Sequence, residues 1–124
     1  MSERALREIY LTSFEKTVKQ AQPWTIMNAY NRLNGTYCAE NKWLLTDVLR
    51  DEWGYKGMIV TDWGAENDRV AGLLAGQELE MPTSNGLGNA QIVEAVKDGR
   101  IPEEYLDKMV DNVLTVIMKS KEVL

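Results

Sequence analysis

The segment MIVTDWGAEND, residues 58–68, places a carboxylate and a large aromatic side chain directly after an apolar run. These two residues are Asp62 and Trp63, and a glycine then ends the pattern. Two further candidates, Met27 and Tyr30, lie in the earlier segment WTIMNAY, which is also mostly apolar. Carboxylates can accept hydrogen bonds from sugar hydroxyls or attack an anomeric carbon, and aromatic faces stack on sugar rings. These residue types are therefore typical of a carbohydrate site.

Each of these residues also has a purely structural interpretation. Asp62 could cap the helix that follows it, as an aspartate before a helix often does. Trp63 and Tyr30 could pack in the core or at its rim, and Met27, in an apolar strand, is by default a core residue. Taken singly, the structural interpretation is the stronger one. Their predicted place at the carboxyl ends of strands favours function, because the loops there form the ligand face of parallel α/β folds.

Glutamates at the same predicted rim leave a similar choice open. Glu78 and Glu80 alternate with apolar residues in the segment QELEMP. They could contribute to a site, but the alternation is also typical of a polar strand face.

The absence of histidine limits the possible chemistry. The chain has no histidine and one cysteine, Cys38, which we expect to be a reduced and partly buried thiol. Ser-His-Asp and Cys-His catalysis therefore cannot be built within the chain, and acid–base work must fall to Asp, Glu, Lys or Tyr. A metal site of the usual zinc ligands is not expected, and no cofactor is predicted.

Charge and hydropathy narrow the range of partners. The net charge is −5 and the basic residues are scattered, which argues against a nucleic-acid partner. No apolar run approaches the roughly 18 residues that would span a bilayer, so no membrane partner is expected. The first residues form a charged helical pattern rather than a secretory signal, and a cytoplasmic location is therefore expected.

Hydrophobic periodicity predicts helices that alternate with short apolar strands. The predicted helices cover residues 2–20, 41–53, 66–75, 89–98 and 102–121, and the predicted strands cover 24–30, 58–63 and 77–82. Strands separated by helices pair in parallel through right-handed crossovers. The runs TIM and MIV are expected to be strands covered on both faces.

The predicted fold class is α/β, a partial (β/α) barrel of about three parallel βα units with flanking helices. Its 124 residues suit a single domain, 1–124, but a closed barrel of this kind needs about 250. The sheet would keep open edges. A missing barrel half, a second domain or self-association is therefore expected to cover them.

A family resemblance gives these patterns a specific meaning. MNAYNRLNGTYCAEN followed by LLTDVLRDEWGYKGMIVTDWGA resembles the glycoside hydrolase family 3 β-glucosidases, and so do ERALREIYLTSFEKTV and AGLLAGQELEMP. The resemblance covers essentially the whole chain. It implies that the chain corresponds to roughly the last three βα units of an eight-unit barrel.

The resemblance also implies a retaining mechanism on terminal β-D-glucosyl residues of a β-glucoside or a short β-linked oligosaccharide. Asp62 matches the family's nucleophile, which forms a covalent glycosyl-enzyme intermediate. Trp63 matches the aromatic residue that walls the sugar site, Tyr30 matches the tyrosine beside the nucleophile, and Met27 matches a residue lining the same subsite. These four residues are the predicted catalytic and substrate-binding set.

The family's pattern is incomplete here. Its Lys-His motif lies upstream of the matched region, and its acid/base glutamate lies in a second domain that this chain lacks. Glu78 and Glu80 are not the positions that the family uses for that role. We therefore expect the isolated chain to be inactive. The alternative is a non-catalytic barrel-fragment module that oligomerises or docks to a complementary chain.

Overall fold

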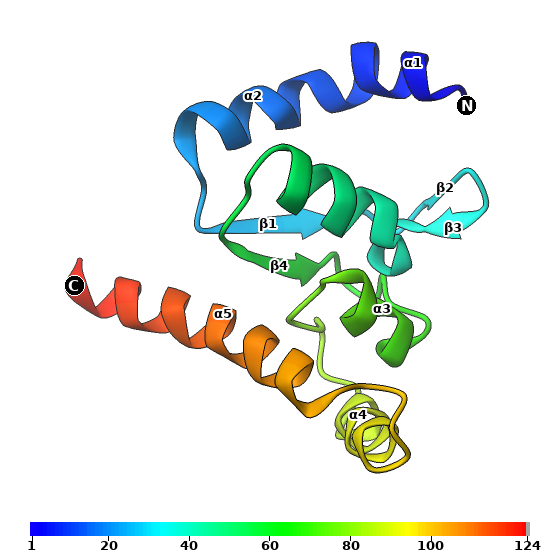
Figure 1. Cartoon of the computed structure of the whole chain (residues 1–124), viewed down its shortest axis with the longest axis vertical. Coiled ribbons are helices and arrows are strands. Elements are labelled where there is room, and N and C mark those ends of the chain that lie inside the picture. Colours follow the sequence, from blue (N-terminus) through cyan, green and yellow to red (C-terminus); the bar gives the residue numbers. More distant parts are fainter. Residues whose placement is uncertain (124) are drawn as a thin grey trace.

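The computed structural model, which describes residues 1–123, is a mixed α/β structure with parallel strands, as the sequence predicts. Strands β1 (Thr25–Asn28) and β4 (Met58–Thr61) pair in parallel. A short antiparallel hairpin, β2 (Arg32–Leu33) and β3 (Thr36–Tyr37), follows β1. Figure 1 shows the two parallel strands between the N-terminal helix and helix α5.

The helices lie close to their predicted ranges, except the short η2 (Cys38–Glu40), for which the sequence predicted no helix. A continuous helical segment comprises α1 (Glu3–Ala5), the π-helical η1 (Leu6–Leu11) and α2 (Thr12–Ala21); the others are η2 (Cys38–Glu40), the π-helical η3 (Trp43–Glu52), α3 (Arg69–Ala75), α4 (Leu87–Lys97) and α5 (Glu103–Glu122). Ser2 caps the first helix, where its hydroxyl accepts a hydrogen bond from the Ala5 N–H. The element order therefore places a helical segment before, between and after the parallel strands.

Two hydrophobic clusters hold these elements together. The larger one joins the N-terminal helix, η3 and β4, with Val18, Val48 and Ile59 almost completely buried. The smaller one joins α3, α4 and α5 around Leu73 and Ile101. Burying apolar side chains of this size stabilises a fold by about 1.5–3 kcal/mol each. The strand that leads to Asp62 thus rests on the larger cluster.

The third predicted strand, 77–82, is reduced to one parallel bridge between Val60 and Leu79. The backbone pairing stops there because the next hydrogen bond goes to a side chain and not to the backbone. The Met81 N–H donates to the Thr61 hydroxyl rather than to a backbone carbonyl, at 2.8 Å. The segment still runs alongside β4 in the parallel sense, but the prediction of a full strand was wrong.

The prediction that both strands are covered on both faces is right for β4 and wrong for β1. In β4, Met58, Ile59 and Thr61 are buried. In β1, Thr25 is exposed and Met27 is 60% exposed, because no described element packs over that face. The apolar run TIM gave no sign of this, since a strand that awaits a cover has the same composition as a covered one.

None of the helices described within residues 1–123 combines the length and the apolar character that a membrane crossing requires.

Candidate active site

The candidate site lies where β1 and β4 end at the same edge of the sheet. Asn28, the last residue of β1, is in register with Thr61, the last residue of β4. The Asp62 N–H then donates to the Asn28 carbonyl at 3.1 Å, so Asp62 lies directly beside the end of β1. Because parallel strands open their carboxyl ends on one side, Tyr30 leaves the sheet at the same edge as Asp62.

The Asp62 side chain orders the turn that it begins. Its carboxylate oxygen Oδ1 accepts a hydrogen bond from the Trp63 N–H at 2.6 Å, and its backbone carbonyl accepts one from the Ala65 N–H at 3.0 Å. The residue is only half-buried. A half-exposed carboxylate fixed by its own loop is available to a ligand at the sheet edge.

The interpretation of Asp62 as a helix cap is wrong. Helix α3 begins at Arg69, and its cap is Asp68, whose carboxylate accepts a hydrogen bond from the Ala71 N–H at 2.9 Å. The sequence contains two aspartates before this helix, and the nearer one takes the capping position. Asp62 is therefore left without a capping role.

The aromatic and thioether candidates do not pack in a core. Trp63 is 71% exposed, Tyr30 is 67% exposed and Met27 is 60% exposed. Among residues 1–123, no hydrogen bond joins the Tyr30 hydroxyl to the Asp62 carboxylate. The structure thus brings the Asp62 carboxylate and three exposed apolar side chains to one edge of the sheet. It shows no hydrogen bond between Asp62 and Tyr30.

Glu78 is neither part of this edge nor part of a polar strand face. Its side chain is fully buried, and its carboxylate accepts hydrogen bonds from the Ile59 N–H at 2.7 Å, from Arg50 at 2.6 Å and from Asn112 at 2.6 Å. Glu80 is half-buried and accepts a hydrogen bond from the Ser84 hydroxyl at 3.0 Å. Both glutamates are thus occupied in structural contacts.

Burial shifts the proton affinity of several groups near the site. It raises the pKa of Glu66 to about 7, against the opposing effect of the Arg69 guanidinium 3.2 Å away. It also raises the pKa of the Glu78 carboxyl and of the Cys38 thiol, which is buried and not, as expected, only partly buried. Glu66 lies in the loop that follows Asp62, and with this pKa it changes charge near neutral pH.

Two residues outside the predicted catalytic and substrate-binding set shape the loop after β4. Thr61 uses its hydroxyl to contact Met81, and the Glu40 carboxylate accepts hydrogen bonds from the N–H groups of Asn67 and Asp68 at 3.1 and 3.0 Å. Thr61 stands directly before the candidate aspartate, which could have drawn attention to it. No local signal marks Glu40, because it acts on residues more than 25 positions away.

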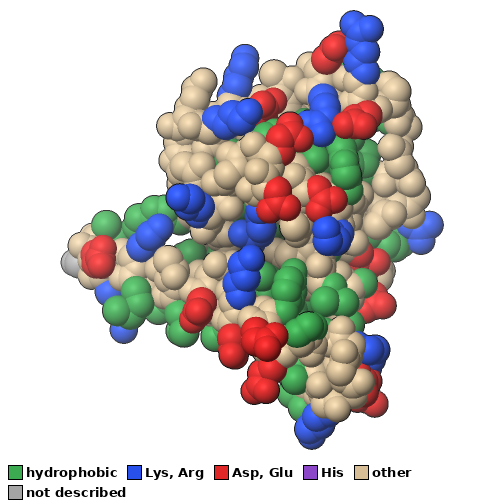
Figure 2. All heavy atoms as spheres, viewed as in Figure 1, with side chains coloured by type: hydrophobic (Ala, Val, Ile, Leu, Met, Phe, Trp, Pro, Cys, Tyr) green, Lys and Arg blue, Asp and Glu red, His purple; other side chains and the backbone are tan. Residues whose placement is uncertain are grey.

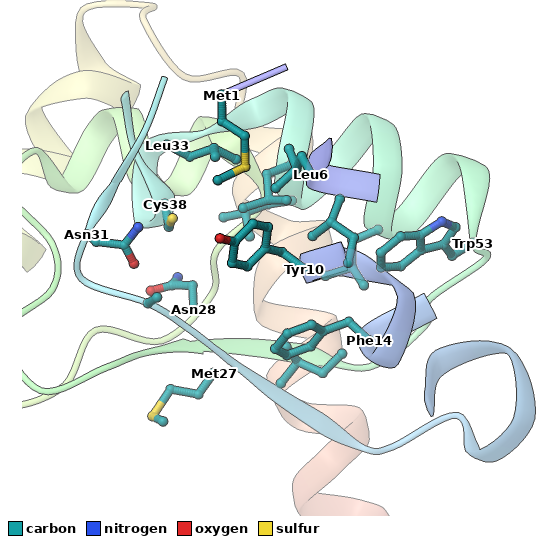
Figure 3. Close-up of a pocket in the computed structure, with 16 residues that line it drawn as sticks. Met1, Leu6, Tyr10, Phe14, Met27, Asn28, Asn31, Leu33, Cys38 and Trp53 are labelled. Carbon is teal, nitrogen blue, oxygen red and sulfur yellow. The ribbon is translucent and has the colours of Figure 1, made fainter. Parts of the chain in front are cut away.

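A separate apolar pocket of about 370 Å³ lies between the N-terminal helix and β1. Leu6, Tyr10, Asn28 and the candidate residue Met27 line it, whereas Asp62 does not. Figure 3 shows Met27 on the other side of the β1 ribbon from Asn28 and Tyr10. The pocket therefore shares Met27 with the candidate set, but its lining does not include Tyr30, Asp62 or Trp63.

Within residues 1–123, no group of three or more His, Cys, Asp or Glu side chains is placed to hold a metal ion.

Parallel strands joined through helices, with polar side chains at their carboxyl ends, are the arrangement found in segments of barrel-like α/β domains. The model of the glycosyl hydrolase family 3 N-terminal domain matches residues 1–116, and the chain belongs to that family. The family resemblance found in the sequence is thereby confirmed.

The chain is similar to a segment of much longer enzymes. It is 56% identical to thermostable beta-glucosidase B of Acetivibrio thermocellus over 122 residues, which are 98% of this chain and 16% of that protein. It is 55% identical to an exo-alpha-(1->6)-L-arabinopyranosidase of Bifidobacterium breve over 121 residues, again 98% of this chain and 16% of that protein. The chain thus spans about one sixth of the length of these relatives.

Solved structures agree with this placement. The crystal structure of the Bifidobacterium adolescentis GH3 beta-glucosidase matches with a TM-score of 0.95 at 56% identity, covering 98% of this chain and 18% of that one. Beta-glucosidase 3B from Thermotoga neapolitana in complex with glucose matches with a TM-score of 0.89 at 48% identity, covering 94% and 17%. The arrangement of strands and helices described above is therefore that of a segment of this family's barrel-like domain.

Proposed function

We propose that this chain is the nucleophile-bearing segment of a retaining β-glucosidase. The observation that carries the proposal is the position of Asp62, whose half-exposed carboxylate follows β4 at the edge where β1 also ends. Membership of a family whose named relatives include β-glucosidases supports it. The proposed substrate is a β-glucoside or a short β-linked oligosaccharide.

In the proposed reaction, a carboxylate oxygen of Asp62 attacks the anomeric carbon of the terminal sugar. The bond from that carbon to the leaving-group oxygen breaks, and the leaving oxygen takes a proton from an acid supplied from outside this chain. Water then attacks the same carbon of the glycosyl-enzyme intermediate. This second step releases the sugar, frees the Asp62 carboxylate and returns a proton to the acid/base residue.

The proposed sugar contacts come from side chains that the structure leaves open. The Trp63 indole supplies a flat apolar wall, Met27 lines the same subsite, and the Tyr30 hydroxyl hydrogen-bonds near the nucleophile. Apolar walls with a few polar groups are typical of small-ligand sites. Their exposure here fits residues that a ligand and the rest of a longer protein would cover.

The isolated chain is proposed to be inactive. A retaining enzyme needs a second carboxyl about 5–5.5 Å from the nucleophile. Glu78 cannot serve, because it is buried and bound to Arg50 and Asn112. Loss of an acid/base residue typically costs about 10²–10⁴ in rate. The missing barrel half and second domain are therefore proposed partners of this segment.

A second candidate function is a non-catalytic barrel-fragment module that associates with itself or with a complementary chain. Exposed apolar side chains favour it: Figure 2 shows them along α5, where Val110, Leu114, Ile117 and Met118 are 46–59% exposed. The same surfaces are expected on a segment of a larger domain, so they do not weigh against the first proposal.

The test is a segment exchange. Residues 2–123 of this chain replace the matching segment of the Acetivibrio thermocellus enzyme, and turnover of an aryl β-glucoside is measured alongside an aryl α-L-arabinopyranoside, because relatives of both kinds are about equally similar. We expect glucoside turnover, and labelling of Asp62 by a mechanism-based fluoro-glucoside, detected as a mass increase that Asp62→Asn abolishes.

Three results would contradict parts of the proposal. An inactive and unlabelled hybrid that is correctly folded would rule out the enzyme-segment function, and a defined homo-oligomer of the isolated chain would then favour the second candidate. Turnover of the arabinopyranoside alone would correct the substrate. Robust turnover by the isolated chain would show that the missing acid is not required.

A further inference from the structure

The loop that carries Asp62 is fastened to the neighbouring segment by one hydroxyl group. Thr61 is 2% exposed, and its side-chain oxygen donates a hydrogen bond to the Met81 carbonyl at 2.9 Å. The same oxygen accepts a hydrogen bond from the Met81 N–H at 2.8 Å. A single hydroxyl thus satisfies both backbone groups of one residue across the gap where the sheet ladder ends.

A second hydrogen bond reaches the same carbonyl from beyond Asp62. The Gly64 N–H donates to the Met81 carbonyl at 2.8 Å. The residues on either side of the Asp62–Trp63 pair, Thr61 and Gly64, therefore converge on one acceptor. This convergence closes the turn, and its geometry depends on where Met81 is held.

The far end of the loop is anchored independently. The Glu40 carboxylate binds the N–H groups of Asn67 and Asp68, and Asp68 caps α3. The loop from 61 to 68 is therefore fixed at both ends, and Asp62 lies next to the end that Thr61 holds. Replacing the hydroxyl by a methyl group of similar shape would leave the part-buried Met81 N–H without this partner.

We propose that Thr61 is a positioning residue for Asp62: its hydroxyl fixes Met81, and through the Met81–Gly64 hydrogen bond it sets the turn that orients the Asp62 carboxylate. This inference rests on the proposed function of Asp62. A nucleophile misplaced by about 1 Å can lose about 10² in rate. A hydroxyl one residue away can therefore matter for turnover without touching the sugar.

The first experiment uses the segment-exchange hybrid with Thr61→Val and Thr61→Ser. We expect Thr61→Val to lower kcat by about 10- to 100-fold with KM changed by less than about threefold, because orientation and not binding is lost. Thr61→Ser keeps the hydroxyl and should stay within about threefold of the parent kcat. Rescue by serine separates the hydroxyl from the packing of the side chain.

The matched control is Thr46→Val. The Thr46 hydroxyl donates to the Ala75 carbonyl at 2.8 Å, which joins η3 to the end of α3 away from the Asp62 turn. Its removal takes away a similar hydrogen bond to a backbone carbonyl. Stability should fall, by less than in Thr61→Val because one hydrogen bond is lost instead of two, while kcat stays within about threefold of the parent.

The second experiment uses the 124-residue chain itself and needs no activity. Amide hydrogen exchange of Gly64 and Met81 should accelerate at least about tenfold in Thr61→Val, relative to the global exchange of the same protein, and not in Thr61→Ser or Thr46→Val. An inactive parent hybrid would count against the proposed function alone, and this measurement would still decide the role of Thr61.

Three outcomes would overturn the inference: a Thr61→Val hybrid within threefold of the parent kcat, a Thr61→Ser hybrid as slow as Thr61→Val, or unchanged exchange at Gly64 in the Thr61→Val chain.

Discussion

Strands β1 and β4 pair residue for residue, yet the rest of the chain holds them very differently. Strand β4 has β1 on one edge and the Leu79 bridge on the other, and Ile59 within it is completely buried. Among residues 1–123, strand β1 pairs on one edge only, and its Met27 side chain is 60% exposed. Strand β4 is thus held by neighbours on both edges, whereas one edge of β1 has no partner strand among residues 1–123.

This difference between the strands matches the different roles proposed for the residues that follow them. Asp62, which would have to meet an anomeric carbon with small positional error, extends from the strand that is held on both edges. Met27 and Tyr30, which would line the sugar subsite, extend from the open strand. The segment of the proposed nucleophile is therefore held in place here, whereas the proposed lining residues Met27 and Tyr30 are largely exposed.

The strongest test of the β4 side concerns Glu78, which joins Arg50, Asn112 and the Ile59 N–H around the start of that strand. Glu78→Ala leaves the Arg50 guanidinium, whose side chain is 12% exposed, without its carboxylate partner. We expect the free energy of unfolding in urea to fall by about 3–5 kcal/mol.

The control is an ion pair on the open surface. Arg4 and Glu8 lie 2.9 Å apart with side chains 84% and 62% exposed. Glu8→Ala should change stability by less than about 0.5 kcal/mol, because solvent screens the pair. Equal losses for the two alanine variants would show that burial does not set the value of these contacts.

A second test compares the strands directly. Ile59→Ala removes a fully buried side chain from the larger hydrophobic cluster, and we expect a loss of about 2–4 kcal/mol. Met27→Ala, on the open face of β1, should cost less than about 0.5 kcal/mol in this chain. Both values come from urea unfolding with unchanged m-values. A large loss for Met27→Ala would mean that a second copy or another element covers β1 in solution.

Much of this fold could be predicted from the sequence because its signals are local. The helix that Ser2 caps, the stop at Gly76 and the apolar run before Asp62 all act within a few residues. They fixed the element order and the place of Asp62 at the end of a strand. The resemblance then named the family, which the comparisons confirmed.

What could not be predicted depends on contacts distant in sequence. The third strand ended early because the Thr61 hydroxyl took the Met81 N–H. The sequence left Glu78 open as a site residue or part of a polar strand face, because its partner Asn112 lies 34 residues away. The roles of Asp62, Trp63, Tyr30 and Met27 remain predictions, because they depend on a ligand and on protein outside this chain.

The smallest expected effect tests the loop that follows β4 through its pH dependence. The Glu66 side chain is 4% exposed, and burial raises its pKa from the ordinary 4.5 to about 7, while Arg69 opposes the shift and Glu80 and Glu40 add to it. Between these two pH values the folded chain keeps a proton that the unfolded chain has released. Stability should therefore fall as pH rises through this window.

The comparison is with Glu66→Gln, which cannot titrate at this position. The unfolding free energy of the parent minus that of the variant should fall on the order of 1–3 kcal/mol between pH 4.5 and 7, and then level off. Urea unfolding at several pH values measures it. Burial also raises the pKa of Glu78, but that contribution is common to both proteins and cancels in the difference. A difference that stays constant with pH would mean that water reaches Glu66, and that the loop is less firmly closed than the strand from which it extends.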